Sequence, residues 1–429
     1  MTAEMMSAET ARFVREHAGD DVRRLALKGA GQGGVDLPFA LDQIAGRQTA
    51  RRKLPLWAAT EGIVYPPRLA MEQCSGEPAA RYKARLAARL MAGGAPGAEA
   101  GCGGEGGRPA AGRLVDLTGG LGADFSFMAR GFSHAVYVER QESLCRLARH
   151  NLPLLGLPGA EVVCADAASY LATMPPADVV CADPARRDSH GGRTYAIGDC
   201  TPDLAALRGL LLAKARFAVA KLSPMLDWRK AAADLGGAVA EVHIVAVANE
   251  CKDLLLVMTA RAAPPLRLAC ANDGRQEWFT VGGAEPQPPA VAPVEGEPEP
   301  PFFLCEPNAA LMKAGCFGRL AARYGLAPLA ANSHLFCSRR PAAGFPGRRF
   351  VVDAVAPMNK KELKKALSSV DRANIAVRNF PLSAPELRRR LKVSEGGSVY
   401  IFATTLANGS HRLLFCHRAP DGLHDGLLG

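Results

Sequence analysis

The sequence predicts an α/β protein in which a mainly parallel, Rossmann-like sheet follows an N-terminal helical domain and precedes small C-terminal α+β domains. Apolar residues recur at helical spacing up to residue 91, and short β-branched runs alternate with helix-length segments over 113–262. Beyond Pro301, helix and strand patterns are mixed. Strands separated by helix-length segments need right-handed crossovers, which give parallel pairing. With 429 residues, the chain can build several domains, each with its own core.

The N-terminal domain is expected over residues 1–91. Stretches such as "FALDQIAGRQTARRKLPLWA" place apolar residues three and four apart and contain few β-branched residues, which is typical of helices. A Gly-rich linker is expected at 92–112, because "AGGAPGAEAGCGGEGGRPAAG" has too few bulky side chains to form a core.

The sheet is expected to contain five parallel strands closed by a hairpin. Five β-branched runs come first, and "EVHIVAVANE" and "CKDLLLVMTA" then follow one another almost directly, which predicts an antiparallel pair at the end of the sheet. This arrangement is typical of methyltransferases, whereas a plain dinucleotide-binding domain seldom ends in this way.

The C-terminal part is expected to form one or two α+β domains. Pro and acidic residues alternate over Ala284–Pro301, which indicates an extended connector or a long loop. The dipeptide Asn408-Gly409 between the last two strands predicts a tight turn. From Phe345 to Glu395 there are twelve Lys and Arg residues against five Asp and Glu residues, so much of the excess positive charge lies here.

Composition excludes several classes of protein. No apolar run is long enough to span a membrane, and the N-terminus lacks the pattern of a signal peptide. The 12 cysteines include no CxxC pair, so we expect free thiols in the cytoplasm and no metal site. The net charge of +10 favours a polyanionic partner, and the sequence assigns no oligomeric state.

The strongest motif is "DLTGGLGADF", which follows a strand and opens a helix. A Gly-rich turn at that place lets the backbone approach a ligand and directs free N–H groups at it. The turn does not fit the GxGxxG pattern of NAD-binding domains. The residues assigned here to cofactor binding are Asp116, Thr118, Gly119, Gly120 and Gly122.

Acidic residues follow the next three strands. Glu139 is seventeen residues beyond Gly122, where a ribose-binding acid is expected, and Asp166 is placed to accept from an adenine amino group. Asp183 ends the fourth strand. Any one of these acids could be only a helix cap. Because the ends of parallel strands meet at one sheet edge, the ordered series predicts a nucleotide-cofactor site, with S-adenosylmethionine favoured over NAD.

These motifs resemble the bacterial class I methyltransferases that carry ferredoxin-like and THUMP-like C-terminal domains. The resemblance implies a methyltransferase domain over 113–262, a ferredoxin-like domain with a Pro-rich loop over 263–344 and a THUMP-like domain over 345–419. THUMP domains bind RNA, so RNA methylation is implied. "DLTGGLGADF" with "VER" is also similar to a stretch of ribosomal RNA guanine-N2 methyltransferases. The family strings include "YPPRLAMEQCSGEPAARYK", "DLTGGLGADF", "ADPARRD", "KLSPMLD", "ANECKDLLL", "EPNAALMKAG", "FPGRRF" and "GGSVYIFATT".

The expected catalytic residues are Asp183, Pro184 and Arg186. In base-amine methyltransferases an Asp or Asn before Pro-Pro and an aromatic residue accepts from the exocyclic amine. Here the acceptor is present and the aromatic residue is missing, so Arg186 or Arg187 could stack on a base or hold a phosphate, or form only a solvated loop. Pyrimidine carbon-5 chemistry is disfavoured because Lys221 stands near the place of its Cys nucleophile.

Substrate contacts are expected from Arg187, Lys360, Lys361 and Arg378, although basic runs on helices are often only solvated faces. Four N-terminal residues of the family string could cover the cofactor or form a helix surface or interdomain contact: Glu72, Gln73, Tyr82 and Lys83. The function expected is methylation of a base nitrogen of ribosomal or transfer RNA. Two alternatives stay open: an RNA-binding protein with an inactive methyltransferase fold, or a methyltransferase acting on a protein or small molecule.

Overall fold

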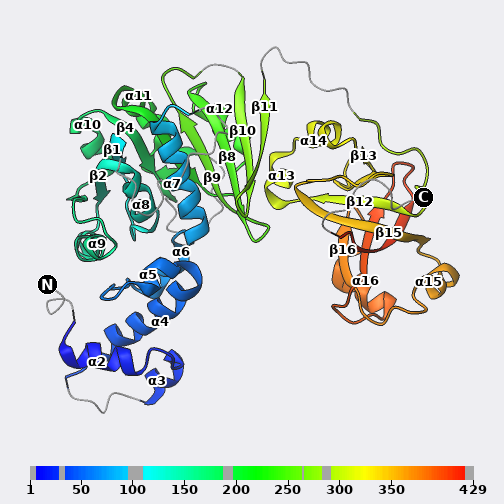
Figure 1. Cartoon of the computed structure of the whole chain (residues 1–429), viewed down its shortest axis with the longest axis horizontal. Helices are drawn as coiled ribbons and strands as arrows, with labels where there is room; N and C mark the ends of the chain where they lie inside the picture. The colour runs from blue at the N-terminus through cyan, green and yellow to red at the C-terminus, as the bar shows by residue number, and fades with distance from the viewer. Residues whose placement is uncertain are drawn as a thin grey trace. The chain divides into compact units, whose positions relative to one another are not determined.

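The computed structural model describes residues 6–28, 34–94, 110–186, 197–262, 265–282 and 291–420. The chain divides into two compact units, Met1–Gly283 and Ala284–Gly429 (Figure 1). Within the described parts, no helix is long and apolar enough to cross a bilayer. Most of the expected Gly-rich linker falls in the undescribed range 95–109.

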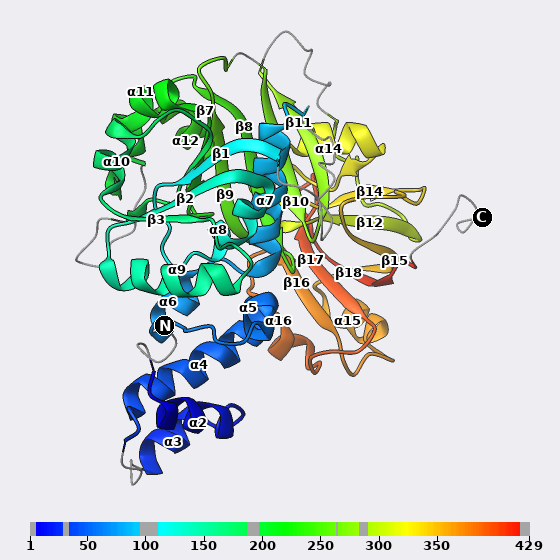
Figure 2. The same cartoon turned by 60° about the vertical axis from the view of Figure 1, so that its left-hand side comes forward.

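Helices form the N-terminal part of the first unit. The longest of them, α4, begins after Asp36, whose carboxylate accepts from the Phe39 N–H at 3.2 Å. Helix α7 lies against the large sheet, and its apolar face, including Leu86 and Leu90, joins the core of that sheet (Figures 1 and 2). The helices are α2 (Ala8–Glu16), α3 (Val22–Lys28), α4 (Leu37–Lys53), α5 (Pro55–Ala59), α6 (Arg68–Gln73) and α7 (Glu77–Met91).

The large sheet has nine strands in the order β11-β10-β8-β9-β7-β4-β1-β2-β3. Strands β3, β2, β1, β4 and β7 are parallel, and β9 is antiparallel to both β7 and β8. The expected fold class, five parallel strands followed by an antiparallel pair, is confirmed. The strands are β1 (Ala110–Asp116), β2 (Phe132–Glu139), β3 (Glu161–Cys164), β4 (Ala177–Ala182), β7 (Ala215–Leu222), β8 (Val239–Val247), β9 (Glu250–Met258), β10 (Leu266–Asn272) and β11 (Arg275–Val281).

The expected hairpin does not end this sheet, because β10 pairs in parallel with β8 and β11 pairs with β10. Both added strands lie within 263–344, the range assigned from sequence to the following domain. Strand patterning identifies a strand but not its partner, and β10 covers the edge of β8 that would otherwise be unpaired.

Helices connect the parallel strands. They are α8 (Ala123–Met128), α9 (Glu142–Leu154), α10 (Ala167–Thr173), α11 (Leu204–Lys214) and α12 (Trp228–Asp234). A short ladder joins β5 (Ala185–Arg186) to β6 (Cys200–Thr201), just beyond the end of β4.

The second unit is built on one seven-stranded sheet, in the order β13-β14-β12-β15-β18-β17-β16. Strand β12 pairs with β15, so the sheet runs continuously through both expected C-terminal domains. The chain reverses at Asn408-Gly409 as predicted, with Gly409 at φ +81°. The elements are β12 (Phe302–Pro307), α13 (Ala309–Ala314), α14 (Phe317–Tyr324), β13 (Ala327–Pro328), β14 (Phe336–Ser338), β15 (Gly347–Pro357), α15 (Lys360–Ala366), β16 (Asn374–Arg378), α16 (Ala384–Leu391), β17 (Tyr400–Thr405) and β18 (His411–Arg418).

Candidate active site

The turn after β1 is held tightly against β2. The Gly119 N–H donates to the Val138 carbonyl at 2.8 Å, and a Cβ on Gly119 would lie 2.1 Å from the buried Tyr137 ring. Gly122 has φ +85° at the start of α8, a conformation that favours glycine. Close packing and backbone shape therefore require glycine at these two positions.

The Glu139 carboxylate joins the end of β2 to this turn. One of its oxygens accepts from the Gly120 N–H at 3.0 Å, and the other accepts from the Gln141 N–H at 2.9 Å. A carboxylate has about four acceptor positions, so capacity remains for further donors such as ribose hydroxyls.

Asp166 follows β3 and caps α10. Its Oδ1 accepts from the N–H groups of Ala168 and Ser169, both at 3.0 Å. The helix-cap interpretation of this residue is thus correct, and Asp166 also lines the cavity beside it.

A cavity of about 600 Å³ lies at the carboxyl ends of β1, β2, β3 and β4. Its volume suits a small cofactor, and its walls include part of α6 and the turn before α7. All residues that sequence analysis assigned to cofactor binding line this one cavity: Asp116, Thr118, Gly119, Gly120, Gly122, Glu139, Asp166 and Asp183.

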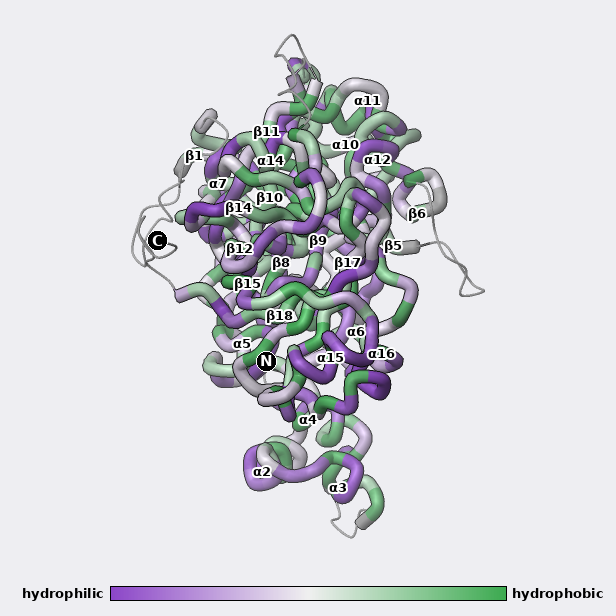
Figure 3. The backbone as a smooth tube through the Cα atoms, turned by 90° about the vertical axis from the view of Figure 1, so that its right-hand side faces the viewer, coloured by the Kyte–Doolittle hydropathy of each residue, from purple (hydrophilic) through white to green (hydrophobic). Residues whose placement is uncertain are grey.

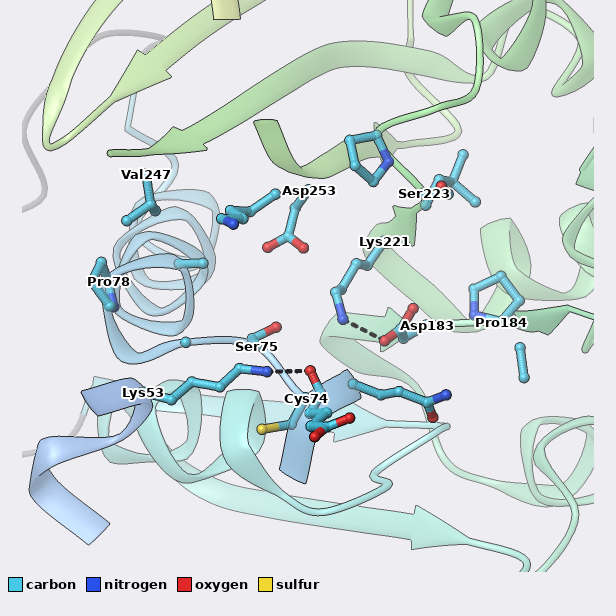
Figure 4. A pocket seen from close by; sticks show the side chains of 18 of the residues that line it. Lys53, Cys74, Ser75, Pro78, Asp183, Pro184, Lys221, Ser223, Val247 and Asp253 are labelled. Atoms are coloured by element: carbon cyan, nitrogen blue, oxygen red, sulfur yellow. Dashed lines mark hydrogen bonds and ion pairs between the residues drawn. The ribbon is translucent and has the colours of Figure 1, made fainter. Parts of the chain in front are cut away.

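A second cavity, of about 1120 Å³, adjoins the first, and we call it the acceptor cavity (Figure 4). The two cavities share Asp183 and Lys221 on the sheet side and Cys74 and Ser75 on the helical side. Pro184 lines only the acceptor cavity. Asp183 therefore lies where a group in one cavity meets a group in the other.

Asp183 is fixed from two sides. Its backbone N–H donates to Thr118 Oγ1 at 2.6 Å, and its Oδ2 lies 2.5 Å from Lys221 Nζ (Figure 4). The backbone of Arg186 lies in β5 and pairs with Cys200, whereas its side chain and the whole of Arg187 lie outside the described residues.

A buried ion network beneath the two cavities was not predicted. Lys83 of α7 donates to Asp253 Oδ2 at 2.7 Å and Ser75 Oγ at 2.7 Å, and its Nζ lies 2.9 Å from Asp124 Oδ1. Lys221 Nζ lies 3.7 Å from Asp124 Oδ2 and extends the network to Asp183. The family strings contain Lys83, Asp124, Lys221 and Asp253, but nothing in them indicates that these side chains meet.

The network and its surroundings shift several pKa values. Burial alone would lower the pKa of Lys221, but the carboxylates of Asp183, Asp124 and Asp253 outweigh it and raise that pKa, so the ammonium stays charged. Burial raises the pKa of Asp116 to about 7. Burial acts to raise the pKa of Asp124 as well, but Lys83 and Lys221 outweigh it and lower that pKa.

The other N-terminal residues of the family string have different positions. Glu72 and Gln73 line the acceptor cavity, and Gln73 also lines the cofactor cavity. Tyr82 is buried, and its hydroxyl lies 2.8 Å from His243 Nδ1. Tyr82 therefore packs between α7 and the sheet, whereas Glu72 and Gln73 face the candidate site.

Three of the predicted RNA-binding residues lie in the second unit: Lys360, Lys361 and Arg378. Lys360 and Lys361 are exposed on α15, a mostly hydrophilic helix (Figure 3). Arg378 instead donates to the buried carboxylate of Glu306 at 2.7 Å, and Arg348 donates to the same carboxylate at 2.6 Å. An RNA contact by Arg378 would have to compete with this ion pair, whereas the two lysines are free to meet phosphates.

Eleven cysteines lie within the described ranges, and no disulfide joins any two of them. One group could hold a metal ion on distance alone, since ligand atoms of Glu142, Cys145 and Cys164 lie within 4.8 Å of one another. Burial raises the pKa of the Cys145 thiol to about 12, which opposes the thiolate that a metal would need. The expected absence of a metal stays a prediction.

Comparison with known proteins extends these observations. The "THUMP domain-like" family matches residues 347–418, and a "ferredoxin-like domain" family matches 303–346. The crystal structure of a "putative methyltransferase" from Porphyromonas gingivalis W83 is 32% identical, with a TM-score of 0.80, and covers 96% of this chain and 98% of that chain. No curated protein matches the chain.

Two further solved structures share only part of the fold. A "putative methyltransferase yhhF" from Escherichia coli is 18% identical, with a TM-score of 0.26, and covers 35% of this chain and 77% of that chain. A "putative methyltransferase" from Streptococcus mutans, in complex with SAH, is 13% identical, with a TM-score of 0.22, and the match covers 26% of this chain and 64% of that chain.

The sheet topology, the glycine turn and the acids at the strand ends define a class I methyltransferase fold. The chain belongs to the family of the Porphyromonas gingivalis protein, in which this fold is joined to ferredoxin-like and THUMP-like C-terminal domains.

Proposed function

We propose that the protein is an S-adenosylmethionine-dependent methyltransferase that methylates a base nitrogen of RNA. The observation that carries this proposal is the position of Asp183, at the junction of the cofactor cavity and the acceptor cavity. A methyl donor in the first cavity and a nucleophile in the second would meet there, and positioning supplies much of the rate of such a transfer.

The residues of the first cavity fit S-adenosylmethionine. Glu139 would accept from the ribose hydroxyls while it holds the turn through Gly120, and Asp166 would accept from the adenine amino group. The cofactor supplies an electrophilic methyl group on a positively charged sulfur. Acidic side chains from the ends of four strands line this cavity, Glu139 and Asp166 among them, and acidic surroundings suit that positive charge.

Asp183 would orient the acceptor nitrogen. Lys221 contacts Oδ2, so Oδ1 can accept an N–H from an exocyclic amine and direct the nitrogen lone pair toward the methyl group. The cofactor would give its methyl group to this nitrogen and keep the electron pair of the broken sulfur–carbon bond, and the proton of the N–H would pass through Asp183 Oδ1 to solvent. Burial raises the pKa of Asp183, and the charged Lys221 acts against this rise and favours the ionised, accepting carboxylate.

Features of the second unit and the size of the acceptor cavity support RNA as the substrate. The match to the THUMP domain-like family, the exposed Lys360 and Lys361, and the net charge of +10 all suit a polyanion. The acceptor cavity, of about 1120 Å³, has room for a nucleotide whose base is turned out of its stack. We propose that the protein acts in the cytoplasm.

One observation favours a second candidate, an RNA-binding protein without catalysis. Arg186 stands where base-amine methyltransferases have an aromatic stacking residue, and Ala185 stands in place of their second Pro. Our proposal assigns the stacking or phosphate contact to Arg186 or Arg187.

Transfer of a tritiated methyl group separates the candidates. The full-length protein and Asp183→Ala would be incubated with labelled S-adenosylmethionine and the RNA, protein and small-metabolite fractions of a strain lacking the gene. We expect label in RNA, loss of that label by at least a hundredfold in the variant, and cofactor affinity unchanged within a fewfold by calorimetry. Label in another fraction would refute an RNA acceptor. Cofactor binding with no label in any fraction would favour the second candidate.

A further inference from the structure

We propose that a third cavity, formed by α7 and the added β10–β11 hairpin, binds the phosphate backbone of the RNA next to the nucleotide in the acceptor cavity. The inference rests on the proposed function and extends it by placing an RNA-binding site in the first unit. The cavity has a volume of about 390 Å³, and three arginines line it: Arg52, Arg81 and Arg85. We call it the arginine cavity.

The arginine cavity is continuous with the acceptor cavity. Arg52, Pro78 and Val247 line both, so the two meet at the end of α4 and the start of α7. In Figure 4, Pro78 and Val247 lie across the acceptor cavity from Asp183 and Pro184. A strand whose target base reaches Asp183 can therefore leave the acceptor cavity past Pro78 and Val247 and enter the arginine cavity.

Two of the three arginines are available to an anion. Arg81 pairs with Glu77 Oε1 at 2.7 Å and lies over the Phe127 ring. By contrast, Arg52 and Arg85 have no carboxylate partner within the described ranges, and Arg85 contacts only the Tyr82 ring, 6.0 Å from its centroid. Guanidinium groups form paired hydrogen bonds with phosphate oxygens, so phosphate is the ligand that suits them.

The acids in the arginine cavity are already engaged. Glu77 is held by Arg81 and by the Leu56 N–H at 2.9 Å, and Asp273 Oδ1 accepts from the Ala248 N–H at 2.7 Å. Positive charge continues toward the acceptor cavity at Lys53, whose ammonium contacts only main-chain carbonyls, those of Met71 and Glu72. Three arginines and Lys53 stand against two acids, Glu77 and Asp273, so positive charge is in excess along this path.

A single strand fits this path better than a duplex. The target base must enter a cavity, which a base stacked in a helix cannot do without being turned out. Contacts made only to phosphates predict binding that depends strongly on salt and little on sequence.

The test is binding of a labelled, unstructured 15-nucleotide RNA to the full-length protein, measured by fluorescence anisotropy at several salt concentrations. The variant Arg52→Ala/Arg85→Ala is compared with Arg15→Ala/Arg51→Ala, which removes the same charge at exposed positions outside both cavities. A plot of log affinity against log salt has a negative slope, and for single strands each phosphate contact makes it steeper by roughly 0.7. Loss of two contacts should therefore make the slope of the first variant shallower by about 1.4 and leave that of the second unchanged.

Five outcomes decide whether the inference stands. Flattening in the cavity variant alone, with S-adenosylmethionine affinity unchanged, supports the inference. Equal slopes in the two variants overturn the inference. Displacement of the RNA by polyglutamate at an equal concentration of negative charge also overturns it, because the site would then bind any polyanion. If the native protein binds S-adenosylmethionine but no RNA, the inference fails while a methyltransferase with another acceptor survives. If it binds RNA as expected but no S-adenosylmethionine, the cofactor assignment fails and the arginine cavity stands.

Discussion

Replacing Lys83 by methionine tests whether the buried ion network fixes α7 to the sheet. The Lys83 side chain is 5% exposed, and those of Asp253 and Asp124 are 6% and 17% exposed. Methionine fills similar space but leaves both carboxylates without this cation. Only Lys221, 3.7 Å from Asp124, stays near them.

The expected loss in the free energy of unfolding is about 3–5 kcal/mol at pH 7, the range for breaking a buried ion pair by removing one partner. The loss should shrink as the pH falls below about 4. The pKa of Asp124 in the folded protein is lowered from 3.8 because Lys83 and Lys221 outweigh its burial. A carboxyl group whose pKa is lower in the folded protein stabilises the fold at pH values above its pKa in the unfolded chain. This stabilisation disappears as the pH falls and the carboxylate is protonated.

Tryptophan fluorescence during urea unfolding measures the stability of the first unit, which contains Lys83. All three tryptophans, Trp57, Trp228 and Trp278, lie in the first unit. The matched control is Lys230→Met, which breaks an exposed pair with Asp234 on one helix and should cost less than about 0.5 kcal/mol.

Two results would refute the reasoning. One is a loss below about 1 kcal/mol, which would mean that the network adds no more than a surface pair. The other is a large loss that does not shrink as the pH falls from 7 to below about 3, since it would point to packing instead of charge. Asp253→Asn placed in the Lys83→Met background should recover part of the stability, because it removes one of the two stranded charges.

Three further predictions concern the cofactor turn. Gly119→Ala should destabilise the first unit by about 1–3 kcal/mol in the same urea assay, because the added Cβ would lie 2.1 Å from the Tyr137 ring. Glu139→Ala should raise the Kd for S-adenosylmethionine by roughly 10- to 100-fold in calorimetry, since hydrogen bonds to a charged group contribute about 1.5–3 kcal/mol. Asp116→Asn should remove a fall in stability between pH 4 and pH 7, because burial raises the pKa of Asp116 from 3.8 to about 7.

The sign of the last effect follows from proton binding. As pH rises from about 4 to 7, the unfolded chain loses the Asp116 proton while the folded chain keeps it, so stability decreases and then levels off. A native pH profile identical to that of the asparagine variant would contradict the raised pKa. Gly159→Ala is the control for Gly119→Ala and should change stability little, because nothing lies within 4 Å of the added carbon. Glu142→Ala, at an exposed position, is the control for Glu139→Ala and should change the Kd for S-adenosylmethionine little.

The cofactor cavity was predictable because its signals are local. Each acid or glycine directly follows a strand, and parallel strands bring their carboxyl ends to one edge, so knowing the strands is enough to group Asp116, Glu139, Asp166 and Asp183. Their individual hydrogen bonds were less predictable. Asp166 caps a helix and lines the cavity at once, and a sequence pattern presents these two roles as alternatives.

The remaining parts depend on contacts that are distant in sequence. Lys83 and Asp253 are separated by 170 residues, and nothing near either one identifies the other. Arg378 belongs to a basic stretch that suggested RNA, yet its partner Glu306 lies 72 residues away and is buried. Charge counts describe composition along the chain, whereas ion pairs depend on packing between elements that the counts do not record.

The N-terminal helices are therefore part of the site and not an appended domain. Helix α7 contributes apolar residues to the core of the sheet, Lys83 to the ion network and Arg85 to the arginine cavity. The end of α4 contributes Arg52 to both the acceptor and arginine cavities. One helix thus joins the core of the sheet, the arginine cavity and the buried network, in which Lys83 meets Asp124 and Lys221 reaches both Asp124 and Asp183.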